Sequence, residues 1–124
     1  RYLADRGADV RVAALAEPST ELARAARERW KGPVEQLEEA APAPLLLDCL
    51  FGTGLSRGLE APVAARLCNL AEAAQLTVAC DLPSGVEADS GALLSRVPAA
   101  DLTVTFGALK PAHRLMPAMT GMGR

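Results

Sequence analysis

Residues 45–60 read LLLDCLFGTGLSRGLE, and the fold is predicted mainly from this stretch. The run 45–50 is apolar apart from Asp48 and Cys49, which is typical of a central strand in a parallel sheet. Three glycines punctuate residues 51–58, and residues 60–75 then place Val63, Leu67 and Leu70 at helical spacing. A buried strand, a glycine loop and an amphipathic helix in this order predict one unit of a parallel α/β sheet.

The same alternation extends over the rest of the chain. Gly7 is expected to close a helical turn over residues 1–6, and Ser19 or Thr20 to cap a helix that runs to about Gly32. Strands are predicted over residues 10–15, 77–82 and 101–106, and a short acidic helix over residues 34–41. Residues 93–97 are expected to form a strand or a crossing segment, and the chain after Gly107 is expected to be irregular. The pattern predicts a mostly parallel sheet with helices on both faces.

Length and charge exclude several classes of protein. The 124 residues fit a single domain, and 13 basic residues against 15 acidic ones give a net charge of -2. This balance and an aromatic content of 3% argue against a nucleic-acid binder, and no apolar run is long enough to cross a membrane. The chain begins at Arg1 without a signal segment, so we interpret it as an interior piece of a longer protein.

The three cysteines are interpreted as reduced thiols. Cys49, Cys68 and Cys80 lie in apolar stretches without C-x-x-C spacing, and they are expected to be buried. This usage favours the cytoplasm. A zinc site is not expected, because His113 is the only histidine.

Two polar clusters follow predicted strands. Asp48 precedes the loop 51–58, and Asp81 begins the turn Asp81-Leu82-Pro83-Ser84-Gly85. The carboxyl ends of parallel strands meet at one edge of a sheet, where ligands bind. Each aspartate could instead simply cap its own loop, but two such acids with glycine turns favour a site.

The glycine loop is a candidate phosphate cradle. Its residues are Gly52, Thr53, Gly54, Leu55, Ser56, Arg57 and Gly58. Glycines let backbone N–H groups approach a phosphate, the following helix N-terminus adds a favourable dipole, and Arg57 adds a cation. The spacing G-x-G-x-x-x-G departs from the dinucleotide fingerprint, so a tight connection without a ligand remains an alternative.

Residues 54–58 also match the nucleophile-elbow pattern G-x-S-x-G. Asp101 and His113 follow Ser56 in the order that hydrolases use. The match is mechanically poor, because an elbow serine directly follows its strand. His113 is instead expected to face the surface or a partner.

The turn at residues 81–85 gathers oxygen atoms. Pro83 and Gly85 favour a tight turn that directs the Ser84 hydroxyl toward the strand end. Carboxylate, hydroxyl and carbonyl oxygens suit a hard cation. We therefore expect the Asp48 and Ser84 oxygens to lie within about 6 Å of each other, room for one cation.

Three blocks together resemble the NAD(P)H-hydrate epimerases, the YjeF N-terminal domain family. They are residues 48–57, 81–91 and 100–111, they occur in the family's order, and the resemblance covers the whole chain. The resemblance implies a Rossmann-like three-layer α/β/α sandwich. It also implies isomerase activity, in which the R form of hydrated NADH or NADPH (NADHX, NADPHX) becomes the S form.

The resemblance also implies roles for individual residues. Asp48 and Ser84 would bind a potassium ion, and the loop from Gly52 to Gly58 together with Asp81 would bind the substrate. We assign Asp81 as the catalytic acid and base, because its carboxylate could assist loss and return of water and stabilise a cationic intermediate.

The family's Asn- and Gly-rich loop and its final strand and helix have no counterpart here, so the chain is expected to be one domain, residues 1–124, truncated at both ends. Whether these residues alone are active stays open.

The implied partner is an ATP- or ADP-dependent NAD(P)H-hydrate dehydratase. Whether this dehydratase is fused to the domain, and whether the domain forms a homodimer, both stay open. The alternatives are a non-catalytic interaction scaffold, which retention of Asp48, Asp81, Ser84 and the loop disfavours, and a nicotinamide dehydrogenase, whose fingerprint is absent.

Overall fold

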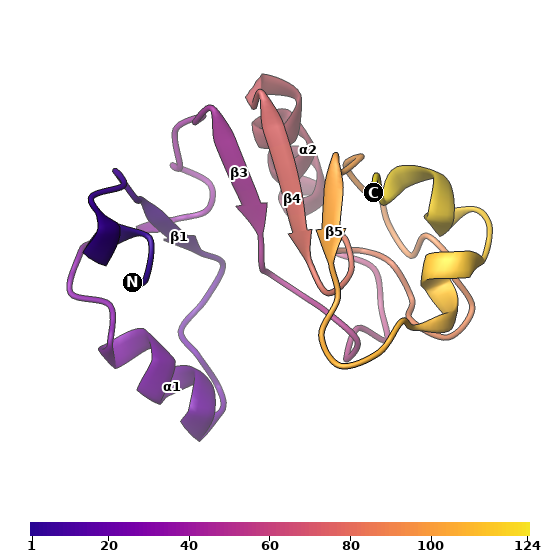
Figure 1. The fold of residues 1–124 in the computed structure, drawn as a ribbon, viewed down its shortest axis with the longest axis horizontal. Coiled ribbons are helices and arrows are strands. Elements are labelled where there is room, and N and C mark those ends of the chain that lie inside the picture. Colours follow the sequence, from indigo (N-terminus) through magenta and orange to yellow (C-terminus); the bar gives the residue numbers. More distant parts are fainter. The chain divides into compact units, whose positions relative to one another are not determined.

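A computed structural model describes all residues, 1–124, and they form two compact units, residues 1–40 and residues 41–124 (Figure 1). The α/β class with parallel strands is confirmed in both units. The strands lie in two sheets, one of two strands and one of three. None of the helices has the length and apolarity that a bilayer crossing requires.

The first unit is a small parallel β-α-β arrangement. A 3-10 turn, η1 (Ala4–Arg6), precedes β1 (Val12–Ala14), α1 (Glu21–Glu28) and β2 (Val34–Gln36). Gly7 closes η1 with a φ of 86°, as expected. The expected capping of α1 is also confirmed, because the N–H of its third residue donates to Thr20 Oγ1 at 3.2 Å.

The acidic helix predicted over residues 34–41 is wrong. Val34, Glu35 and Gln36 form β2, and Val34 pairs with Val12 of β1 in a parallel ladder. The N–H of Leu37 extends the pairing by donating to the Ala14 carbonyl at 2.9 Å. Pairing with a strand distant in sequence outweighed a weak local preference for helix.

The second unit holds the three-stranded sheet. Its strands are β3 (Leu45–Asp48), β4 (Leu76–Cys80) and β5 (Leu102–Val104), in the order β3-β4-β5 and parallel throughout. The helix α2 (Ala61–Ala73) joins β3 to β4 and lies behind the sheet in Figure 1. Pro62 in its first turn favours the helix start, because the missing N–H would have no partner there.

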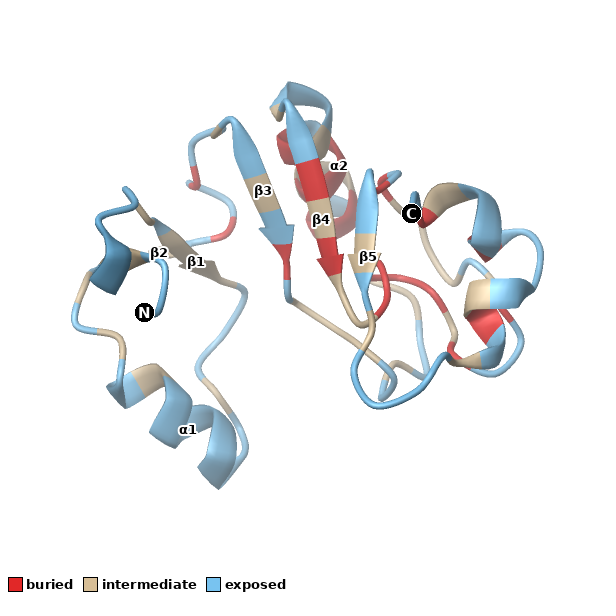
Figure 2. Ribbon diagram, in the orientation of Figure 1, coloured by how far each residue is buried: buried red, intermediate tan, exposed pale blue.

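One face of this sheet is buried and the other is exposed. Thr77 and Ala79 of β4 are buried, and so are Leu67 and Cys68 of α2; Figure 2 shows buried residues on both elements. On the opposite face Leu45 and Leu47 are 44% and 42% exposed. The prediction that residues 45–50 form a buried central strand is therefore wrong, because β4 is central and β3 is an edge strand of this sheet.

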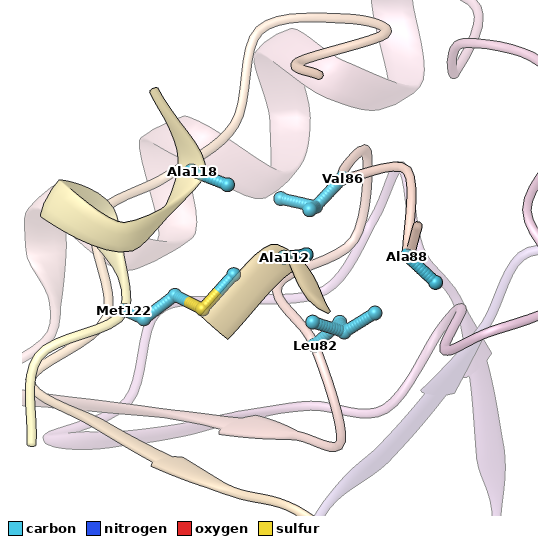
Figure 3. Packing of buried hydrophobic residues seen from close by; sticks show 6 residues of the cluster. All are labelled: Leu82, Val86, Ala88, Ala112, Ala118 and Met122. Carbon is cyan, nitrogen blue, oxygen red and sulfur yellow. The ribbon is translucent and has the colours of Figure 1, made fainter. Parts of the chain in front are cut away.

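The main apolar cluster lies beside the sheet, around the turn that follows β4. Figure 3 shows its members, which are Leu82, Val86, Ala88, Ala112, Ala118 and Met122. The last three come from the segment after Gly107, which forms the 3-10 turns η2 (Pro111–Arg114) and η3 (Ala118–Gly121). The segment after Gly107 therefore packs against the Leu82 cluster, although an irregular end was predicted. Within residues 93–97 the only strand-like pairing is one bridge between Val86 and Leu93.

Candidate functional site

Asp48 and Ser84 meet at the carboxyl end of the sheet. Asp48 is the last residue of β3, and Ser84 lies in the turn after β4. The Ser84 hydroxyl donates to Asp48 Oδ1 at 2.6 Å, and the Ser84 N–H donates to Asp48 Oδ2 at 2.8 Å. The expected approach of these oxygens is confirmed, and both residues are buried.

The turn that carries Ser84 is fixed by its glycine. Gly85 has a φ of 109°, and a Cβ placed on it would lie 2.7 Å from Ser95 Oγ. Both observations require a residue without a side chain. The turn holds Ser84 so that Phe51 N–H donates to its Oγ at 3.0 Å, while the Phe51 carbonyl lies 3.4 Å from the same atom.

These oxygens could serve as ligands for a hard cation. The buried Asp48 carboxylate takes part in none of the chain's ion pairs, and its partners are the Ser84 hydroxyl and the N–H groups of Ser84 and Leu50. A buried carboxylate is costly unless hydrogen bonds or a positive charge compensate it, and a bound cation would add to the three hydrogen bonds that Asp48 accepts. The residues present therefore fit a monovalent or divalent hard cation, whose ligands would include Asp48 and Ser84.

Asp81 occupies an unusual backbone position directly after β4. Its φ is 73°, and it is the one residue other than glycine with a positive φ. Its N–H donates to the Val104 carbonyl at 2.7 Å, which holds this conformation against β5. Non-glycine residues in this region are uncommon and concentrate at functional sites.

One oxygen of the Asp81 carboxylate accepts all of its hydrogen bonds. Asp81 Oδ1 accepts from Lys110 Nζ, from Thr105 Oγ1 at 3.1 Å and from Phe106 N–H at 3.3 Å. The ion pair is partly enclosed, because the side chains of Asp81 and Lys110 are 15% and 18% exposed. Oδ2 accepts no hydrogen bond from the chain, and it lies 3.2 Å from where a Cβ of Gly52 would stand.

The surroundings of Asp81 act on its pKa in both directions. Burial is the largest single influence and raises the pKa, but the hydrogen bond from Lys110, those from Phe106 N–H and Thr105, and the Lys110 charge together lower it. The net result is a pKa below the ordinary value for aspartate. Asp81 is therefore ionised at neutral pH, with one oxygen occupied and the other facing the glycine loop.

Lys110 and His113 are functional candidates that sequence reasoning missed. Lys110 Nζ also donates to Thr105 Oγ1 at 2.9 Å and to the Phe106 carbonyl at 2.8 Å. His113 Nδ1 accepts from Lys110 N–H at 2.9 Å, so Nε2 carries the proton and donates to the Asp81 carbonyl at 2.9 Å. The expectation that His113 faces the surface is wrong, because the turn η2 returns it to Asp81.

The glycine loop keeps its backbone donors available. None of the N–H groups of residues 52–58 donates a hydrogen bond within the chain. Thr53, Gly54, Ser56 and Arg57 are exposed, and α2 begins at Ala61. A Cβ on Gly58 would lie 2.2 Å from the Leu94 carbonyl oxygen, so the close approach of these backbones requires glycine here. The loop thus ends at a fixed point, begins beside Asp81 at Gly52, and has N–H groups without a partner in the chain.

The hydrolase arrangement does not form. Asp101 Oδ2 accepts from Thr77 N–H at 2.8 Å, and His113 is engaged with Asp81 and Lys110. Ser56 makes no hydrogen bond with either residue. The G-x-S-x-G match is therefore accidental.

All three cysteines are free thiols, but only Cys68 is buried. Cys49 is exposed and Cys80 is partly buried, which corrects the prediction that all three are buried. The pKa of Cys49 rises to about 12, first through loss of hydration at the strand ends, then through the Cys80 contact and the Asp48 charge. For Cys49 the prediction failed because β3 lies at the edge of its sheet, whereas Cys80 is the last residue of the central strand β4.

A separate hollow of about 270 Å³ lies within residues 1–40, where β1 ends and α1 begins. It is lined by Ala14, Ala16, Glu17, Pro18, Ala23, Arg27, Val34 and Gln36. None of the residues predicted to form the site lines it.

Comparison with known proteins identifies related sequences. The family model described as "YjeF-related protein N-terminus" matches residues 1–112. The "Bifunctional NAD(P)H-hydrate repair enzyme Nnr" of Thermofilum pendens is 33% identical over 94% of the chain and 25% of its own length. The "NAD(P)H-hydrate epimerase" of Rhodobacter capsulatus is 39% identical over 77% of the chain and 48% of its length.

The protein called "NAD(P)H-hydrate epimerase" in Levilactobacillus brevis is 32% identical over 86% of the chain and 52% of its own length. The chain therefore spans about a quarter of the bifunctional relative and about half of the two epimerases.

Proposed function

We propose, because the chain belongs to the family of YjeF-related protein N-termini, that it is an isomerase acting on hydrated NADH and NADPH. The reaction would convert the R form of the hydrate into the S form. The names of the relatives support this activity. The structural observation that carries the proposal is Asp81 Oδ2, which accepts no hydrogen bond within the chain and lies beside Gly52, at the start of the loop 52–58.

The chemistry needs a negative charge close to the reacting carbon. The C6 hydroxyl of the hydrate lies next to the ring nitrogen. When this hydroxyl takes up a proton from solvent, the nitrogen lone pair drives its departure as water and leaves a cationic ring. Water that returns to the opposite face gives the other epimer. A carboxylate beside C6 would stabilise the cation and take a proton from the returning water.

Asp81 is the residue suited to this role. Its lowered pKa keeps it ionised, which favours charge stabilisation and the role of base over the role of acid. Lys110 acts on Asp81 Oδ1 and holds the carboxylate so that Oδ2 remains directed at the loop. We therefore assign Lys110 as a positioning residue, while Asp81 is the catalytic residue.

The loop 52–58 would bind the phosphates of the dinucleotide. Its amides are free, Arg57 is exposed, and α2 begins just beyond the loop. Free amides near a helix N-terminus favour an anion. This assignment includes Gly52, Thr53, Gly54, Leu55, Ser56, Arg57 and Gly58 as substrate-binding residues.

A potassium ion is proposed at Asp48 and Ser84. The support is the set of converging oxygens from a buried carboxylate, a hydroxyl and the Phe51 carbonyl. When bound there, the ion would supply the positive charge that compensates Asp48. Asp48 and Ser84 would then fix the start of the glycine loop, because Ser84 already accepts from Phe51 N–H.

The bifunctional relatives suggest the partner. We propose that this domain works with a second NAD(P)H-hydrate repair activity, either fused to it or separate, as the bifunctional relatives suggest. We propose further that this partner is an ADP- or ATP-dependent dehydratase and that both act in the cytoplasm, which reduced thiols favour. A non-catalytic scaffold remains the alternative, but no observation favours it, because the candidate residues Asp48, Asp81 and Ser84 are all retained.

The proposal is tested by following the R-to-S conversion of NADHX by chiral chromatography, with the protein in its full-length form. We expect conversion clearly faster than the spontaneous reaction, and faster in potassium than in sodium at equal ionic strength. The variant Ser84→Ala should lose the preference for potassium. Conversion no faster than in buffer would refute the activity, whereas equal rates in both salts would refute only the ion.

A further inference from the structure

Two thiols face each other at the carboxyl end of the three-stranded sheet. The sulfur atoms of Cys49 and Cys80 are 3.1 Å apart, although the residues are 31 positions apart in sequence. Their contact follows from the parallel register, in which Asp48 lies opposite Ala79, so the next residues on each strand are also neighbours. They point to the face of the sheet opposite to Asp48, because successive side chains alternate.

The backbone geometry at this point permits a covalent link. Neighbouring strands lie about 4.8 Å apart, within the roughly 4.4–6.8 Å between Cα atoms that disulfides span. The sulfurs would have to close from 3.1 Å to the bond length of about 2.05 Å. Cys49 lies one residue beyond the end of β3, so the backbone movement that brings the sulfurs together would occur outside the strand pairing.

Solvent can reach the pair from one side. Cys49 is exposed and Cys80 is half-buried, whereas Cys68 of α2 is buried and has no cysteine partner. Peroxide therefore reaches Cys49 before Cys80. Because the pKa of Cys49 is raised, little of it is thiolate at neutral pH and its oxidation is slow, and Cys80 lies beside it as the thiol that resolves the product.

We propose that Cys49 and Cys80 form a reversible disulfide under oxidising conditions. With hydrogen peroxide, the sulfur of Cys49 is first oxidised to a sulfenic acid, and one water is released. The sulfur of Cys80 then attacks the sulfur of Cys49, the S–O bond breaks, the S–S bond forms, and a second water leaves. In total two thiols lose two hydrogens and two electrons, and one peroxide is reduced to two waters.

The link would be labile rather than structural. Closing two sulfurs across adjacent strands moves the strand ends, and strained or exposed disulfides are easier to reduce than relaxed ones. The reduced pair is therefore the resting state in a reducing compartment, and the oxidised pair is a response to peroxide.

Mass spectrometry of the whole protein tests the proposal directly. After peroxide treatment and removal of excess oxidant, we expect a loss of two hydrogens in mass, a loss of two titratable thiols, and recovery of both with dithiothreitol. Peptide mapping without reduction should join the peptides of Cys49 and Cys80. This mapping needs no variant, so it remains valid if a variant folds poorly.

The matched variants are Cys68→Ser, which should still form the bond, and Cys49→Ser and Cys80→Ser, which should not. Three free thiols after treatment, oxygen adducts on Cys49 without cross-linking, or a bond that involves Cys68 would each overturn the proposal. None of these readouts depends on the proposed isomerase activity.

A consequence for activity does rest on the proposed function. Asp48 precedes Cys49 and Asp81 follows Cys80, so bond formation shifts the backbone next to both acids. Oxidised protein should lose at least half of its NADHX conversion, and dithiothreitol should restore it. If the bond forms with activity unchanged, the modification stands and its coupling to the site is refuted.

Discussion

The two oxygens of the Asp81 carboxylate have different surroundings. Oδ1 is held by Lys110, Thr105 and the Phe106 N–H, while Oδ2 accepts nothing and faces Gly52. A group that served only to stabilise the turn would gain from using both oxygens. The asymmetry is typical of a side chain that is fixed on one side and available on the other.

The first prediction concerns Asp81→Asn. The substitution is close in shape, so the fold should persist, while loss of the charge and of the base should lower epimerisation by roughly 10²–10⁴-fold. Chiral chromatography of NADHX measures the effect, with the spontaneous reaction as the floor. Asp89→Asn removes an exposed carboxylate and serves as the control. Unchanged conversion in Asp81→Asn would place the catalytic group elsewhere.

The second prediction concerns stability and pH. The folded-state pKa of Asp81 is lowered, so its contribution to stability is present above the unfolded value of about 3.9 and is lost as the pH falls through the folded value. Lys110→Met removes the main lowering interaction. The variant should therefore be less stable than the wild type at pH 7. The difference should begin to shrink below about pH 4 and disappear only below the lowered pKa of Asp81.

Urea denaturation across this pH range measures the difference in the free energy of unfolding. Lys31→Met is the control, because the exposed Lys31 donates only to the Glu28 carbonyl. A constant gap between Lys110→Met and the wild type from pH 7 to pH 3 would show that the ion pair does not set the pH dependence.

The two α-helices differ in how far they contribute to a core. The helix α2 buries Val63, Ala64, Leu67, Cys68 and Leu70, whereas α1 buries none of its residues. α1 is held locally by its Thr20 cap and α2 by packing. Substitutions on the two helices should therefore differ in effect.

Leu67→Ala and Leu22→Ala form a matched pair for the third prediction. Leu67 is 2% exposed, so its truncation should lower the free energy of unfolding by roughly 2–5 kcal/mol. Leu22 is 85% exposed, and its truncation should change stability by less than about 0.5 kcal/mol. Urea denaturation distinguishes the two, and equal losses would contradict the assignment of α2 as the packed helix.

Sequence reasoning succeeded where a local pattern determined the element. The periodicity of residues 60–75 predicted α2, and the glycine turn predicted that Ser84 approaches Asp48. It failed where distant pairing decided, as for β2, which forms only because β1 lies beside it. The exposure of Cys49 was missed for a related reason, because a run of apolar letters does not show which strand is at an edge.

Lys110 illustrates a further limit of sequence reasoning about the site. It lies 29 residues beyond Asp81, in a segment without helical or strand periodicity, and the turn η2 alone brings it back. Lys110-Pro111 did lie in a block that resembled the family, and this was the available signal. Its contact with Asp81 depends on the buried Ala112 and Met122, which fix the tail against Leu82.

The whole molecule consists of two units with very different interiors. Within residues 1–40 only Leu37 and Ala40 are buried, whereas residues 41–124 contain α2, the three-stranded sheet and the cluster around Leu82. The free energy needed to open a region locally rises with the number of apolar contacts that the region buries. Most of the stability, and every residue placed in the candidate site, therefore belongs to residues 41–124.

Hydrogen exchange tests this division, and it is the last prediction. The amides of β4, a central strand with the buried residues Thr77 and Ala79, should exchange slowest, near the rate set by global unfolding. The amides of β1 and α1 should exchange at least about 100-fold faster, since their opening exposes little apolar surface. Mass spectrometry of peptic fragments measures both in one sample. Equal protection of the two regions would mean that residues 1–40 open only with the rest of the chain, and the molecule would then unfold as one cooperative unit.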